Sequence, residues 1–321
     1  MNKIFPKTIA LVGSSGSDYG YGHLRRLVSL SAILEYENTL CLHGNFEKTN
    51  EFYQIIEGSR NLILCKCNSN PDTVIIDSYD IKVLSKIRFK NSPKLIQIID
   101  ELSPKLWANA YIEASPTLNW RPLNRSANIK KFRNNPILRR EFFSNLYSRT
   151  PRISEIDSIL VLTGSSNLSR QVITYLSEIF SYDIQGYKLT IATNDQELGK
   201  FSKSLGFHVV PFLNDFQNLT KDYKLIVSAC GVTAWELLKL QCNCVLLSLA
   251  DNQDLQLQYL KANFNVGGLK FDLNNSLLKT ELIEVITKSL SSSKEKTINL
   301  SPSVDDGAVA AVVWLKDLNY I

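Results

Sequence analysis

The sequence has no run of about 18 apolar residues, the length that a helix needs to cross a bilayer. The apolar stretch near its start, within MNKIFPKTIALVGSSG, is too short for the core of a signal peptide. We therefore expect no membrane span, and the expected location is the cytoplasm.

A dense basic face with interleaved aromatic residues is also absent. The chain carries 36 Lys and Arg residues against 31 Asp and Glu, spread along its length with one local enrichment of basic residues around 130–140. Nucleic-acid-binding proteins usually gather basic residues on one face, with aromatic residues between them. The charge pattern therefore argues against a nucleic-acid partner and suits a small anionic ligand.

Motifs of several common enzyme classes are missing as well. There is no G-x-S-x-G turn of the serine hydrolases. The G-x-G-x-x-G dinucleotide fingerprint fails because Arg25 stands at the third glycine position. Most of the six cysteines lie in apolar runs. Four of them form two C-x-C pairs without a nearby histidine, a pattern that favours structural thiols over a zinc site. The six are Cys41, Cys65, Cys67, Cys230, Cys242 and Cys244.

Short apolar, β-branched runs do occur, and they alternate with helical patterns. This rhythm runs from TIALVG to KLIQIID, stops in a stretch rich in Pro, Asn and Arg (103–151), and restarts at DSILVLTGSSN. It predicts two Rossmann-like α/β domains with parallel sheets, 1–150 and 151–321, and a ligand cleft between the carboxyl ends of the two sheets. We expect the last helix, near 306–318, to be buried, and its packing back on the first domain is one option.

The first candidate site is DYGYGHLRRL, where a strand meets a helix. Gly20 and Gly22 allow a tight turn close to a ligand, and a helix start favours anions. His23 can accept a proton from water or a hydroxyl at neutral pH, or it can simply cap the helix. Carboxylates also follow two strands of this domain, at Asp77 in VIIDSYDI and Asp100 in QIIDELSP, which suggests a polar rim.

The second candidate site is IVSACGVTAWELLKL. Gly231, Val232 and Thr233 open a helix, and their backbone N–H groups suit a pyrophosphate. Glu236 either accepts hydrogen bonds from ribose hydroxyls or is a solvated carboxylate of the first turn. In LADNQDL, Asn252 and Gln253 either bind sugar hydroxyls or belong to a helix cap.

Taken together these motifs resemble the UDP-2,4-diacetamido-2,4,6-trideoxy-β-L-altropyranose hydrolase family of pseudaminic acid biosynthesis. Gly20, Gly22, His23 and Arg26 match its G-x-G-H-x-x-R motif, and Asp77 with Tyr79 matches D-x-Y. NNPILRREF, SACGVTAWE and DNQ are similar to its later motifs, in the same order.

The resemblance implies a glycosyltransferase-B architecture and metal-independent hydrolysis of a UDP-sugar, without a cofactor. It makes His23 the catalytic base, with Asp77 and Tyr79 as further candidate catalytic residues. The expected substrate-binding residues are Gly20, Gly22, Arg26, Gly231, Val232, Thr233, Glu236, Asn252 and Gln253.

Two other functions stay open. An inverting glycosyltransferase would use the same donor site, with His23 deprotonating an acceptor hydroxyl. The aromatic residues of 107–120 either form an acceptor platform or close the core. A non-catalytic nucleotide-sugar-binding protein is the other alternative. It is suggested by TGSSN (163–167), which replaces the family's G-G-x-D loop, while Cys230 replaces the first glycine of its G-G pair.

Overall fold

The chain divides into two compact units, residues 1–143 with 305–321, and residues 144–304. The computed structural model describes residues 8–16, 21–34, 39–57, 62–64, 70–78, 91–100, 106–116, 120–132, 135–139, 142, 157–164, 166–212, 216–291 and 307–321. Two expectations lie outside these ranges: the domain boundary near residue 150, and the positions of Gly20 and Tyr79.

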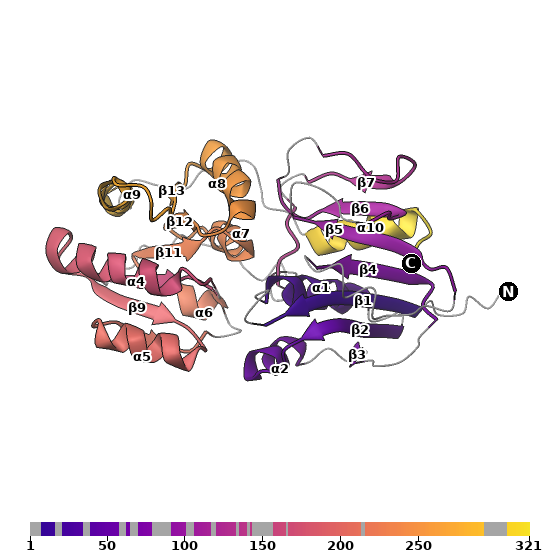
Figure 1. Ribbon diagram of the computed structural model, residues 1–321, viewed down its shortest axis with the longest axis horizontal. Coiled ribbons are helices and arrows are strands. Elements are labelled where there is room, and N and C mark those ends of the chain that lie inside the picture. Colours follow the sequence, from indigo (N-terminus) through magenta and orange to yellow (C-terminus); the bar gives the residue numbers. More distant parts are fainter. Residues whose placement is uncertain are drawn as a thin grey trace. The chain divides into compact units, whose positions relative to one another are not determined.

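The first unit is built on a parallel sheet whose seven strands have the order β3-β2-β1-β4-β5-β6-β7 (Figure 1). The strands are β1 (Thr8–Ser15), β2 (Thr39–Phe46), β3 (Leu62–Leu64), β4 (Thr73–Asp77), β5 (Lys94–Ile99), β6 (Ala110–Glu113) and β7 (Asn128–Lys130). Every neighbouring pair is parallel. The order reverses between β1 and β4, which is where ligands bind in open α/β sheets.

Helices α1 (Gly22–Leu34), α2 (Asn50–Ile56) and α10 (Gly307–Asp317) belong to this unit. Alternate residues of β1 enter different clusters: Ile9 and Leu11 join the main core with α1 and α10, whereas Ala10 and Val12 pack on the opposite side. The two helices contact each other, and Ala308, Ala311, Val312 and Leu315 of α10 lie in the same core. The last helix of the chain thus completes the core of the first unit.

The second unit repeats the design with a parallel sheet of order β10-β9-β8-β11-β12-β13. Its strands are β8 (Ser158–Leu162), β9 (Lys188–Ala192), β10 (His208–Val210), β11 (Leu225–Ala229), β12 (Cys244–Ser248) and β13 (Gly267–Lys270). Uninterrupted burial of β8 and β12 is typical of strands that are covered on both faces.

The helices of this unit are α4 (Ser169–Glu178), α5 (Gln196–Ser204), α6 (Phe216–Thr220), α7 (Val232–Lys239), α8 (Asp251–Phe264) and α9 (Leu278–Ser291), with a π-helical turn, η2 (Ile179–Asp183), directly after α4. Apolar residues of α4, η2 and α9 share one core with the sheet. Helices α7 and α8 meet through Trp235, whose ring contacts those of Tyr259 and Phe264.

Candidate functional site

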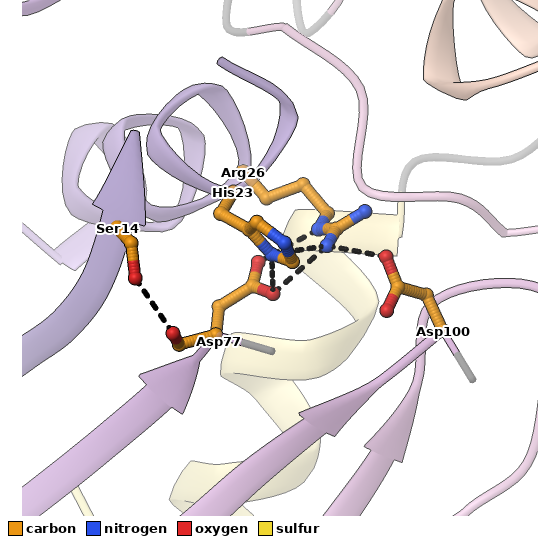
Figure 2. A network of polar contacts seen from close by, with 6 residues as sticks. Ser14, His23, Arg26, Asp77 and Asp100 are labelled. Carbon is orange, nitrogen blue, oxygen red and sulfur yellow. Dashed lines mark hydrogen bonds and ion pairs between the residues drawn. The ribbon is translucent and has the colours of Figure 1, made fainter. Parts of the chain in front are cut away.

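Four charged or titratable side chains gather at the carboxyl end of the first sheet (Figure 2). His23 and Arg26 stand three residues apart on α1 and therefore share a face of that helix. Asp77 is the last residue of β4, and Asp100 directly follows β5, the next strand of the sheet. The charged cluster, as we call these four residues, joins one helix to two adjacent strand ends.

Arg26 connects the two carboxylates of the charged cluster. Its Nε donates to Asp77 Oδ2 over 2.7 Å, and its Nη2 donates to Asp77 Oδ1 over 2.8 Å and to Asp100 Oδ2 over 2.6 Å. His23, Arg26 and Asp77 are only 2%, 5% and 1% exposed. The two carboxylates therefore lie around one buried guanidinium at the strand ends, Asp77 buried and Asp100 partly buried.

The ionisation of Asp77 follows from this arrangement. Burial alone raises the pKa of Asp77, but the positive charge of Arg26, the interaction with His23 and the hydrogen bonds from both residues outweigh it and lower this pKa to about 2. Asp77 is therefore a carboxylate at neutral pH, and its oxygens only accept hydrogen bonds.

The hydrogen of the His23 ring can be placed from the same contacts. Nδ1 lies 2.6 Å from Asp77 Oδ1 and 2.9 Å from Arg26 Nη2. Because the carboxylate has no hydrogen to give, and because Nη2 directs its two hydrogens at carboxylates, we assign the ring hydrogen to Nδ1. In its neutral form the ring then carries its lone pair on Nε2, as a general base requires.

Close approach of α1 to the sheet makes these contacts possible. Gly13 of β1 pairs with Asp77, and a Cβ at Gly13 would lie 2.7 Å from Leu27 Cδ1 and 2.9 Å from the Asp77 carbonyl oxygen. Glycine at this position therefore lets the helix lie near the strand end that carries Asp77.

The structure describes only some of the other residues predicted for this site. Gly22 begins α1, as expected, whereas Gly20 and Tyr79 are outside the described ranges. Figure 2 shows Ser14 beside the charged cluster. Ser14 Oγ lies 2.7 Å from Ser78 Oγ. Arg26 was expected to bind substrate; the structure shows its contacts with Asp77 and Asp100, and substrate binding by Arg26 stays a prediction.

The second candidate site lies within the second unit, at the turn between β11 and α7. Gly231 is the N-cap of α7, without a side-chain cap, and Val232 and Thr233 form the first turn of the helix as expected. Cys230 is fully buried, and burial raises the pKa of its thiol to about 12. Cys230 is thus an inert packing group.

Glu236 is 1% exposed, which excludes the solvated carboxylate considered above. In the first turn of α8, Gln253 Oε1 accepts the N–H of Leu249 over 3.0 Å, so this amide fixes the loop before the helix, and Asn252 is half-buried. Their predicted contacts with ribose and sugar stay predictions.

Sequence reasoning missed Gln256. It stands one turn after Gln253 on α8 and binds the backbone carbonyls of Cys230 and Gly231. Only its spacing from Gln253 points to it, since nothing in the sequence shows which backbone groups a buried amide reaches.

Within the described ranges, no three His, Cys, Asp or Glu side chains are grouped as a metal site would need. Cys41, Cys230, Cys242 and Cys244 form no disulfide there, and Cys65 and Cys67 lie outside these ranges. None of the described helices is both long and apolar enough to cross a bilayer. The cytoplasmic location stays a prediction.

Solved structures with a similar fold cover nearly the whole chain. S. aureus MnaA, in a co-structure with UDP, superposes with a TM-score of 0.61 at 11% identity, over 98% of each chain. A putative UDP-N-acetylglucosamine 2-epimerase from Listeria monocytogenes gives 0.59 at 11% identity, over 98% of this chain and 97% of that one. MurG of Acinetobacter baumannii gives 0.56 at 12% identity, over 97% of this chain and all of that one.

The chain has the glycosyltransferase-B fold. This confirms the predicted fold class of two Rossmann-like units, and at these identities the likeness shows the fold alone. No family model matches the sequence. An uncharacterized protein of Methanocaldococcus jannaschii is 25% identical, over 87% of this chain and 66% of its own length, so the chain spans just under two thirds of that relative.

Proposed function

We propose that this protein hydrolyses a UDP-activated amino sugar at its anomeric carbon and releases UDP. The observation that carries the proposal is the contact between His23 Nδ1 and the ionised Asp77, 2.6 Å apart, which leaves the lone pair of the imidazole on Nε2. A histidine held in this way is a suitable base for activating water.

In the proposed step, His23 Nε2 takes a proton from a water molecule while the water oxygen attacks the anomeric carbon. The bond between that carbon and the diphosphate oxygen breaks, its electron pair leaves with UDP, and the sugar is inverted. Asp77 stabilises the imidazolium that forms, and Arg26 keeps Asp77 ionised. Backbone N–H groups at Gly231, Val232 and Thr233 hold the diphosphate and stabilise the charge of the leaving group.

Fold neighbours support UDP as the nucleotide. MnaA was solved with UDP, and the Listeria protein is named for UDP-N-acetylglucosamine. The sequence motifs around His23 and Gly231 support an amino sugar, and UDP-2,4-diacetamido-2,4,6-trideoxy-β-L-altropyranose is the first substrate to test.

An inverting glycosyltransferase is the second candidate, and Trp107 favours it. This indole is 70% exposed, so it can stack on an acceptor, whereas Trp120 is buried and donates to Glu113. In that reaction His23 would deprotonate an acceptor hydroxyl in place of water. Faster UDP release on adding a sugar acceptor, with a coupled product, would identify a transferase.

The decisive experiment incubates the protein with a panel of UDP- and CMP-sugars and identifies the products by mass. Hydrolysis predicts UDP and a free sugar that carries one oxygen from ¹⁸O-labelled water. The His23→Ala variant should lose roughly 10²- to 10⁴-fold in kcat, the usual contribution of a positioned base, and should still bind UDP. Wild-type turnover by this variant would exclude His23 as the base, and UDP binding without any turnover by the wild type would indicate the non-catalytic alternative.

A further inference from the structure

One buried amide fixes the turn between β11 and α7. Gln256 of α8 places its Nε2 2.9 Å from the carbonyl oxygen of Cys230 and 2.8 Å from that of Gly231. A side-chain amide nitrogen has two hydrogens, so it can donate to both carbonyls at once. Gln256 is buried, which shields these bonds from competing water.

These bonds also set the direction of two backbone N–H groups. In a trans peptide the N–H points opposite to the C=O of the same plane. The Cys230 carbonyl shares its peptide with the Gly231 N–H, and the Gly231 carbonyl shares its peptide with the Val232 N–H. Gln256 draws both carbonyls toward α8, and the Gly231 carbonyl also accepts the Ala234 N–H over 3.1 Å, so the N–H groups of Gly231 and Val232 are aimed away from α8.

The space next to the Cα of Gly231 is open. A Cβ built on Gly231 meets no heavy atom of the described residues within 4 Å. The backbone at Gly231, with φ of −98° and ψ of −152°, does not lie in the left-handed region that favours glycine. Neither the protein's own packing nor its dihedral angles require glycine here, whereas close approach of a ligand to the backbone does explain it.

We propose that Gln256 is a positioning residue, which aims the N–H groups of Gly231 and Val232 at the phosphates of UDP. The inference rests on the proposed function, because it takes UDP as the ligand of this turn. Gln256 acts through the backbone and does not itself touch the nucleotide.

The test compares Gln256→Leu and Gln256→Glu with the wild type and with Gln258→Leu. Leucine removes the donor, and ionised glutamate at pH 8 replaces it with an acceptor of nearly the same size. Gln258 is the matched control, since it is the same residue type on the same helix but is exposed. UDP affinity is measured by calorimetry, uridine affinity by ligand-observed NMR, and folding by thermal melting.

Both Gln256 variants should bind UDP about tenfold more weakly, since hydrogen bonds to charged groups are lost or misaligned, and should bind uridine within twofold of the wild type. Gln258→Leu should match the wild type for both ligands.

Unchanged UDP affinity in a folded Gln256 variant would overturn the inference, and so would an equal loss of uridine affinity, which indicates general damage. If Gln256→Leu does not fold, Gln256→Glu decides. If the wild type itself binds no UDP, both the proposed function and this inference are wrong. That result differs from the two outcomes above, which concern only the Gln256 variants.

Discussion

The charged cluster of the first unit and the β11–α7 turn of the second unit are held in place by different forces. His23 is fixed by a hydrogen bond to the buried carboxylate of Asp77, which is itself ion-paired with Arg26, whereas a neutral amide and the backbone fix Gly231 and Val232. A proton-transfer group needs a partner that fixes its tautomer and stabilises the charge it gains, so charged neighbours suit it. An anion site needs only aligned dipoles, which do not change with pH. The two regions should therefore respond differently to mutation and to acid.

The largest effect on stability is expected for Arg26→Ala. This change leaves the carboxylate of Asp77 buried without its guanidinium, and breaking a buried ion pair from one side costs about 3–5 kcal/mol. Amide hydrogen exchange across β4 measures the loss, while exchange across β11 serves as the internal control. The loss relative to the wild type should shrink as the pH falls toward 2, where Asp77 of the wild type gains a proton as well. Equal loss in both strands would show that Arg26 supports the fold as a whole.

The second largest effect on stability is expected from acid, which should lower the free energy of unfolding of the first unit. The pKa of Asp77 is about 2 in the folded chain against an ordinary value of 3.8. A carboxyl group whose pKa is lowered on folding adds stability above its unfolded pKa, and this contribution is lost as the pH falls through the folded value. The contribution is about 2 kcal/mol, since each pKa unit corresponds to about 1.4 kcal/mol.

Exchange across β4, followed from pH 5 to pH 2, should reveal this acid-dependent loss. Asp77→Asn cannot titrate at this position and should lose that part of the pH dependence. The neutral contacts of Gln256 predict no matching step in the β11–α7 turn. Identical pH profiles for β4 in the wild type and in Asp77→Asn would contradict the assignment.

How much of this comparison the sequence could reveal differs between the two regions. Strand ends and helix starts follow from local patterns, so His23, Asp77 and the helix opening at Gly231 were found. The bond from Arg26 to Asp100 joins residues 74 positions apart, and it depends on how closely Gly13 lets α1 approach the sheet. Gln256 was missed because its partners are backbone carbonyls, which have no signature in the sequence. Local periodicity predicts where strands and helices begin and end. Tertiary packing decides which side chains reach the backbone groups at those ends.

The smallest effect is expected for an ion pair at the surface of the second unit. Lys200 Nζ lies 2.8 Å from Glu197 Oε1 on α5, about as close as Arg26 lies to Asp77, but both side chains are about 70% exposed. Water screens such a pair and its side chains lose entropy when they are held, so Lys200→Ala should change the free energy of unfolding by about 0.5 kcal/mol or less. Hydrogen exchange across β9 and β11 measures it, and 0.5 M NaCl should remove what difference there is. A loss of stability close to that of Arg26→Ala would mean that the distance within an ion pair, rather than its burial, sets its contribution. Desolvation would then not explain the contrast between the two pairs.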